Sequence, residues 1–173
     1  MEDCNLSSIS GKQVPRSNTI ARSNRIFVVH GHDGEIKQDV ARTLEKLKLE
    51  PIILHEQPNA GKTIIEKFEK YSDVGFAIVL LTPDDNGYPN TESGTNARPR
   101  ARQNVIFEMG YFIGRLGRER VLVLYREQDG FEKPSDYDGV LYTVYDPTGR
   151  WRFELVKELK AVGYEIDANL LVQ

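Results

Sequence analysis

One segment, residues 74–81 (VGFAIVLL), constrains the fold of this chain more than any other. A β-strand that is apolar on both faces needs cover on both sides, and such strands are typical of parallel sheets between two layers of helices. The run is also far shorter than the roughly 20 apolar residues that span a bilayer. The segment therefore predicts a soluble α/β domain in which residues 74–81 form a central strand.

Strand and helix patterns alternate on both sides of this segment. Between short β-branched runs, apolar residues recur every three or four positions, as in helices that bury one face. This alternation predicts a doubly wound, mostly parallel sheet of five strands with helices on both faces. The other predicted strands are 26–29, 51–54, 121–125 and 140–145, and the predicted helices are 36–47, 62–71, 101–117 and 151–162.

The length of 173 residues suits one domain with short extensions. Residues 1–23 are rich in Ser and Asn and show no apolar period, which predicts a flexible N-terminal arm. We expect the folded domain to cover residues 24–169. Residues 170–173 are then a short C-terminal tail.

Composition and charge argue against several classes of protein. The chain has 23 Lys and Arg against 26 Asp and Glu, a net charge of -3, which is too balanced for a general binder of nucleic acid or membrane surfaces. Cys4 is the only cysteine, so neither a disulfide within the chain nor a cysteine-based zinc site is available. The first 20 residues lack the apolar core of a signal peptide. We expect a cytoplasmic protein with no nucleic-acid or membrane partner.

Two motifs that suggest other chemistry are incomplete. His30 and His32 lie two residues apart at a strand end, without a suitable third ligand in the sequence, so no metal site is predicted. The residues Gly61-Lys62-Thr63 resemble the end of a phosphate-binding P-loop, but the glycine that this motif needs five residues earlier is Glu56. The chain is therefore not predicted to be a P-loop NTPase.

Ligands of open parallel sheets bind beyond the carboxyl ends of the strands. The segments expected there are 30–34, 55–62 and 82–100. The third contains Pro83, Pro89 and Pro99 and is too long for a simple connection. Loops of that length are either binding loops or disordered, and the sequence leaves both alternatives open.

Three arginines, Arg98, Arg100 and Arg102, surround the start of the predicted helix 101–117. The amino end of a helix attracts anions through its dipole and its free N–H groups. The cluster therefore indicates a seat for phosphate. The alternative is an exposed basic loop without a ligand.

Glu108 lies at the edge of the buried face of the same helix. At 100° per residue it is about 60° from the line of the apolar stripe, with Asn104 and Arg115 on its side. Glu108 then pairs with Arg115, extends to solvent, or shares a pocket with Asn104. The stripe itself consists of Val105, Met109, Phe112 and Leu116.

Four segments together resemble a known family: 25–33 (RIFVVHGHD), 50–59 (EPIILHEQPN), 80–85 (LLTPDD) and 100–110 (RARQNVIFEMG). The chain is similar to the bacterial TIR-like domains once described as predicted nucleotide-binding proteins. These occur as effector domains of cyclic-nucleotide antiphage defence, including TIR–STING fusions. The resemblance covers about residues 24–169 and implies a flavodoxin-like TIR fold.

The resemblance also implies an activity, the cleavage of NAD+ at the bond between nicotinamide and ribose. The catalytic glutamate of the family falls on Glu108. Many TIR NADases have an aromatic residue four positions earlier, where this chain has Asn104, so an aromatic wall would come from elsewhere, such as Phe107 or Tyr111. The predicted substrate-binding residues are His30, Gly31, His32, Asp33, Thr82, Asp84, Asn104, Arg100 and Arg102, and the predicted assembly loop contains Pro58, Asn59, Gly61 and Lys62.

The expected function is thus an NAD+ glycohydrolase that releases nicotinamide and either ADP-ribose or a cyclic variant. NAD+ is the substrate, and no further cofactor is predicted. The expected partners are other TIR domains, through self-association, and a cyclic-nucleotide sensor in the same or another chain. The alternatives are a non-catalytic TIR interaction module and a domain that senses a nucleotide without turnover.

Overall fold

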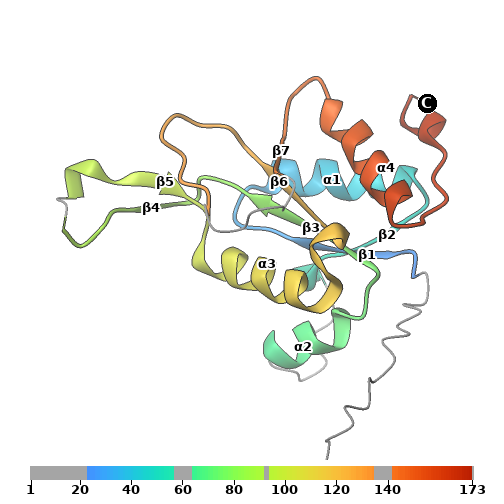
Figure 1. The fold of residues 1–173 in the computed structure, drawn as a ribbon, viewed down its shortest axis with the longest axis horizontal. Coiled ribbons are helices and arrows are strands. Elements are labelled where there is room, and N and C mark those ends of the chain that lie inside the picture. Colours follow the sequence, from blue (N-terminus) through green and yellow to red (C-terminus); the bar gives the residue numbers. More distant parts are fainter. Residues whose placement is uncertain (1–22, 57–63, 92–93, 135–141, 173) are drawn as a thin grey trace, which may run out of the picture.

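The computed structural model describes residues 23–56, 64–91, 94–134 and 142–172 (Figure 1). Its main strands are β1 (Arg25–Val29), β2 (Glu50–Ile52), β3 (Phe76–Leu81), β6 (Val121–Tyr125) and β7 (Tyr142–Val144). They form one parallel sheet in the order β2-β1-β3-β6-β7. The prediction of a five-stranded parallel sheet with the 74–81 segment at its centre is confirmed.

Helices cover both faces of the sheet, as the apolar β3 strand requires. Successive side chains of a strand point to opposite faces, so Ile78 and Val79 of β3 belong to different cores. One face is covered by α1 (Gly34–Lys46) and α4 (Arg150–Ala161), and the other by α2 (Ile64–Tyr71) and α3 (Gln103–Leu116) (Figure 1).

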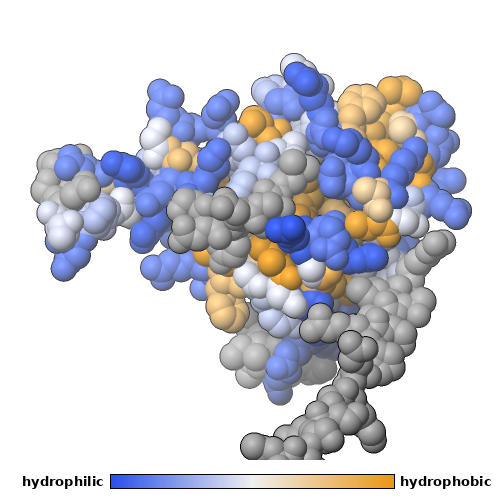
Figure 2. Space-filling view, in the orientation of Figure 1, coloured by the Kyte–Doolittle hydropathy of each residue, from blue (hydrophilic) through white to orange (hydrophobic). Residues whose placement is uncertain are grey.

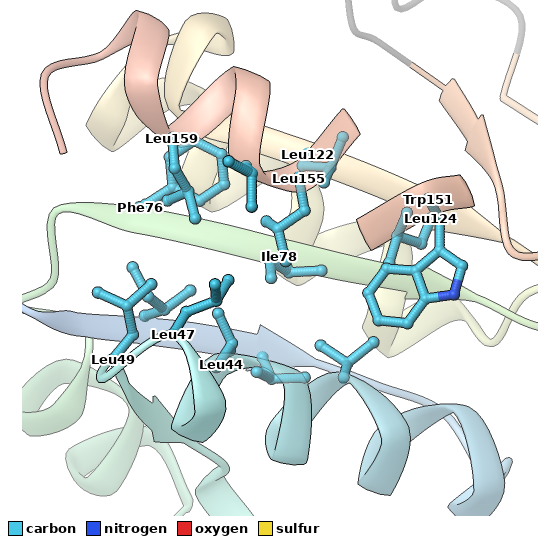
Figure 3. Close-up of a cluster of buried hydrophobic side chains, with 14 of the residues drawn as sticks. Leu44, Leu47, Leu49, Phe76, Ile78, Leu122, Leu124, Trp151, Leu155 and Leu159 are labelled. Atoms are coloured by element: carbon cyan, nitrogen blue, oxygen red, sulfur yellow. The ribbon is translucent and has the colours of Figure 1, made fainter. Parts of the chain in front are cut away.

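Figure 3 shows the core between the sheet, α1 and α4. Trp151, Leu155 and Leu159 of α4 are at most 1% exposed, and their spacing of four residues places them on one face of the helix. The helix begins where the Asp146 carboxylate accepts hydrogen bonds from the backbone N–H groups of Arg150 (3.3 Å) and Trp151 (3.2 Å). Such a cap satisfies donors that a helix leaves free in its first turn.

The folded part extends slightly beyond the expected domain end at residue 169. A short 3-10 helix, η4 (Ala168–Leu171), packs Leu170 and Leu171 against the core of α1 and α4. The sequence predicts a C-terminal tail from residue 170, but the apolar side chains of Leu170 and Leu171 are stabilised by partial burial on this core. The domain therefore reaches at least Leu171.

The remaining strand and helix ends lie close to the predicted ones. The strand predicted at 51–54 ends at Ile52, and the short 3-10 helix η1 (Leu54–Glu56) follows. The strand predicted at 74–81 begins only at Phe76. α3 ends at Leu116, and Gly117 follows with a φ of 86° that suits glycine and cannot continue the helix.

Residues 82–100 contain regular structure, so the alternative of a disordered loop is wrong for their described part, whereas a binding role stays a prediction. β4 (Asp85–Gly87) pairs antiparallel with β5 (Arg98–Arg100), and the hairpin projects from the body of the domain (Figure 1). In the view of Figure 2 its surface is mostly hydrophilic. Strands of three residues, one of them interrupted by Pro99, give no recognisable period, and this explains why the sequence did not reveal them.

None of the helices in the described ranges is both long and apolar enough to cross a membrane. The predicted arm at 1–23 lies outside the described residues except for Ser23.

Candidate active site

The topology places a ligand position between the carboxyl ends of β1 and β3. The chain after β1 enters α1 on one face of the sheet, whereas the chain after β3 leads to α3 on the other. Adjacent parallel strands whose connections diverge in this way mark the usual binding crevice of doubly wound sheets. The loops after β1 and β3 contain several predicted site residues.

Asp84 links the two loops across this point. Its Oδ2 atom accepts hydrogen bonds from the Thr82 hydroxyl (2.8 Å) and from the backbone N–H of His32 (3.1 Å). Thr82 is only 1% exposed. Gly31 allows this approach, because a Cβ atom at this position would overlap the Asp84 carboxylate. The structure therefore brings together Thr82, Asp84, Gly31 and His32 through contacts with one another. Their role in substrate binding stays a prediction.

Asp33 has two structural partners. Its Oδ1 atom caps α1 by accepting from the N–H groups of Glu35 (3.1 Å) and Ile36 (3.2 Å). Its Oδ2 atom lies 2.9 Å from Nε of Arg126, whose Nη2 also lies 3.0 Å from Glu35 Oε2. Asp33 thus holds the start of α1 against the end of β6.

Arg126 is a further charged residue at the carboxyl edge of the sheet, and the sequence patterns did not indicate it. It follows β6 directly, just as His30 follows β1 and Thr82 follows β3. A positional rule applied to every strand end would have found it. His30 itself is half-buried and donates from Nδ1 to the carbonyl oxygen of Gly31 (2.7 Å).

The three arginines are not equivalent. Arg102 occupies the N-cap position of α3, and its Nη1 lies 2.8 Å from Nε2 of His32. Arg100 is half-buried in β5, with its guanidinium close to Gly87 of the facing strand. Arg98 is exposed in the same strand. Of the predicted anion seat, only Arg102 contacts the loop after β1.

Glu108 is half-buried on α3 and has no hydrogen-bond or ion-pair partner among the described residues. The alternative of a pair with Arg115 is wrong, because the Arg115 guanidinium lies 3.1 Å from Tyr111 Oη and 3.8 Å from Asp73. Burial raises the pKa of Glu108 from 4.5 to about 7. The group can therefore change its charge near neutral pH.

The face of α3 that carries Glu108 is directed toward α2. One turn after Glu108, the Tyr111 ring lies 4.7 Å from that of Phe68, and its hydroxyl lies 3.1 Å from Ser72 Oγ. α2 and α3 both start at the carboxyl edge of the sheet, and Glu108 lies one turn closer to that edge than Tyr111. Asn104, one turn earlier on this face, is exposed.

The two aromatic residues suggested for the wall of the site, Tyr111 and Phe107, differ in their surroundings. The Tyr111 ring packs against Phe68 and Phe112, and its hydroxyl lies within hydrogen-bond distance of Ser72. Phe107 is 73% exposed.

The predicted assembly loop with Pro58, Asn59, Gly61 and Lys62 lies outside the described residues. Within the described ranges, no group of three or more His, Cys, Asp and Glu side chains is arranged to hold a metal ion.

Comparison with known families agrees with this architecture. Residues 25–147 match the family described as CAP12/Pycsar effector protein, TIR domain. The chain belongs to this family. The prediction of a bacterial TIR domain of the antiphage-effector type is confirmed, and so is its flavodoxin-like α/β fold.

Several proteins are similar to this TIR domain. The protein YuaY of Escherichia coli (strain K12) is 53% identical over 148 residues, which are 85% of this chain and 48% of YuaY. Protein tirC of Dictyostelium discoideum is 38% identical over 130 residues, 70% of this chain and 64% of tirC. The Pycsar effector protein PaPycTIR of Pseudomonas aeruginosa is 39% identical over 82 residues, 47% of this chain and 25% of PaPycTIR. The TIR domain thus spans less than two thirds of each of these relatives.

Proposed function

We propose that this TIR domain cleaves NAD+ at the bond between nicotinamide and ribose, with Glu108 as the catalytic carboxylate. One observation carries the proposal. Glu108 is half-buried without a hydrogen-bond or ion-pair partner among the described residues, and it lies near the carboxyl edge of the sheet, where doubly wound folds bind ligands. A desolvated carboxyl group without a structural partner is typical of functional sites.

The reaction suits a site with a single carboxylate. When the C–N bond breaks, its electron pair goes to the pyridinium nitrogen, and nicotinamide leaves as a neutral ring. The leaving group therefore needs no general acid, unlike the sugar oxygen of an ordinary glycoside. Ionised Glu108 would stabilise the positive charge that develops on the ribose, and this interaction is strongest in the transition state.

The nucleophile determines the product. Attack by water at the ribose carbon, with loss of a proton, yields ADP-ribose. Attack by the adenine ring of the same molecule yields a cyclic product instead.

The loop after β1 and the start of α3 are the proposed substrate-binding elements. Arg102 combines a cation with a helix amino end, and both favour the diphosphate of NAD+. His32 lies against Arg102, and Asn104 is exposed two residues further along α3. The dinucleotide would extend from Arg102 toward Glu108.

The test is release of free nicotinamide from NAD+ by wild type and by Glu108→Gln. The amide has nearly the same size and no charge, so we expect loss of activity with an unchanged fold by circular dichroism. Glu127→Gln is the matched control, because Glu127 is exposed beyond β6. Full activity in folded Glu108→Gln would show that another group is catalytic. Binding of NAD+ without any nicotinamide release by wild type would favour a sensing domain.

We further propose that the domain acts in antiphage defence and becomes active by self-association. Support comes from the family and from PaPycTIR, which is a Pycsar effector protein. The proposed partners are other TIR domains and a cyclic-nucleotide sensor in the same or another chain.

A non-catalytic interaction module is the second candidate. The observation in its favour is that Phe107 on α3 and Phe153 on α4 are 73% and 57% exposed and could contact other proteins. In that case neither the wild type nor Glu108→Gln would release nicotinamide, and the two proteins would associate with other TIR domains equally well.

A further inference from the structure

The hydrogen bonds of Asp84 hold together two segments that the sheet does not connect. Backbone pairing between β1 and β3 ends at Val29 and Val79. Beyond Val29 the chain enters α1 on one face of the sheet, whereas β3 continues to Leu81 beside β6 and leads to α3 on the other face. The bond from the His32 N–H to Asp84 Oδ2 then joins positions 52 residues apart.

A single oxygen atom of Asp84 accepts hydrogen bonds from both segments. Asp84 Oδ2 accepts from Thr82, which is buried at the end of β3, and from His32, which is exposed in the loop after β1. The Thr82 hydroxyl therefore holds the carboxylate in place, and the carboxylate holds the loop. Gly31 fits closely around this oxygen, since a Cβ atom there would overlap Oδ2 and lie 3.1 Å from Thr82 Oγ1.

The link continues from His32 to α3. Nη1 of Arg102 lies 2.8 Å from Nε2 of His32. A guanidinium group only donates hydrogen bonds, so Nε2 accepts and the ring proton lies on Nδ1. The position of the Arg102 guanidinium therefore depends on His32, whose backbone is held by Asp84.

We propose that Asp84 is a positioning residue, which sets the loop at Gly31 and His32 and, through His32, orients Arg102 for the substrate. Asp84 does not itself contact the substrate in this arrangement. The substrate side of the inference rests on the function proposed above. The link between Asp84 and His32 does not, and it can be measured in the free protein.

The first experiment is amide hydrogen exchange of the full chain without NAD+, followed at His32 by NMR. In Asp84→Ala we expect exchange at His32 to accelerate by about tenfold or more, because the acceptor of this N–H is lost. Asp84→Asn should stay close to the wild type, since its carbonyl oxygen can accept the same two bonds. Asp85→Ala is the matched control, a neighbouring carboxylate in β4. Unchanged exchange at His32 in Asp84→Ala would overturn the proposal.

The second experiment separates KM from kcat in nicotinamide release. Loss of one well-placed interaction is worth about tenfold, so Asp84→Ala should raise KM for NAD+ by about that factor while kcat changes less. Asp84→Asn should restore most of the wild-type KM. Gly31→Ala should resemble Asp84→Ala, because its methyl group displaces the carboxylate.

The outcomes distinguish the two proposals. If kcat falls equally in Asp84→Asn and Asp84→Ala, the charge of Asp84 acts on the reaction and the positioning role is wrong. If the wild type releases no nicotinamide, the proposed NADase function fails, whereas the exchange at His32 still decides the role of Asp84.

Discussion

At the scale of single residues, Glu108 connects the proposed chemistry with pH. Its pKa of about 7 results from burial, which disfavours the ionised form. If the carboxylate stabilises developing positive charge, activity requires its ionised form. We therefore expect kcat/KM to rise with pH and to level off above about 7.

Initial rates of nicotinamide release between pH 5 and 9 would check this expectation. Bound NAD+ places a pyridinium cation near Glu108, so the midpoint in kcat should lie below that in kcat/KM. A rate that falls as pH rises through 7 would indicate that Glu108 acts as an acid instead.

The same group makes stability depend on pH. Below about pH 4.5 Glu108 is neutral in both the folded and the unfolded chain, and it adds no penalty. As pH rises toward 7 the unfolded chain ionises first, so the free energy of unfolding falls, and the full loss is present above about pH 7. The free energy of unfolding of Glu108→Gln does not fall in this way, because glutamine does not ionise. Its stability relative to wild type should therefore increase by roughly 1 to 3 kcal/mol between pH 4.5 and pH 8.

Urea unfolding of both proteins at these two pH values measures the difference. Glu127→Gln provides the baseline, because its side chain is exposed in wild type. A difference between Glu108→Gln and wild type that is the same at both pH values would mean that Glu108 is not desolvated.

At the scale of elements, the predicted arginine cluster lies on two different elements, the start of α3 and the β4–β5 hairpin. Arg102 lies at the N-cap and contacts His32, whereas Arg98 is exposed in β5. We expect Arg102→Gln to raise KM for NAD+ by about tenfold, with a smaller change in kcat, because one charge-assisted contact to the diphosphate is lost. The effect of Arg98→Gln should be distinctly smaller. Steady-state kinetics of the two variants, measured at constant ionic strength, provide the comparison. Equal effects would place the diphosphate along the hairpin.

At the scale of the whole molecule, we propose that activity depends on the assembly of several TIR domains. Asn104 stands where many TIR NADases have an aromatic residue, and its replacement by Tyr111, packed between helices, or by Phe107, 73% exposed, stays a prediction. We expect specific activity to rise with protein concentration as TIR domains assemble and complete the site. Nicotinamide release across a dilution series, with light scattering on the same samples, tests this.

Gly61→Pro in the predicted assembly loop is the companion variant, and it should shift the concentration dependence. Constant specific activity in samples that contain only monomer would show that one chain holds a complete site.

The sequence by itself determined the layers of this protein. Burial leaves a local pattern in the sequence, and this pattern suffices to predict strands, helices and their order. Examples are the continuous apolar run 74–81 and the helical spacing of Val105, Met109, Phe112 and Leu116. The same period placed Glu108 at the edge of the buried face. The proposed catalytic role of Glu108 comes from the resemblance to TIR domains.

Only the tertiary structure decided which partners the polar residues have. Asp84 meets His32 across 52 positions, and Arg126 meets Glu35 across 91. No local period records such pairs, because they depend on which strand ends become neighbours in the sheet. Arg115 likewise lies 3.8 Å from Asp73, which precedes β3, and it forms no pair with Glu108. Strand order is a property of the packed sheet, and it brings together side chains that the sequence keeps far apart.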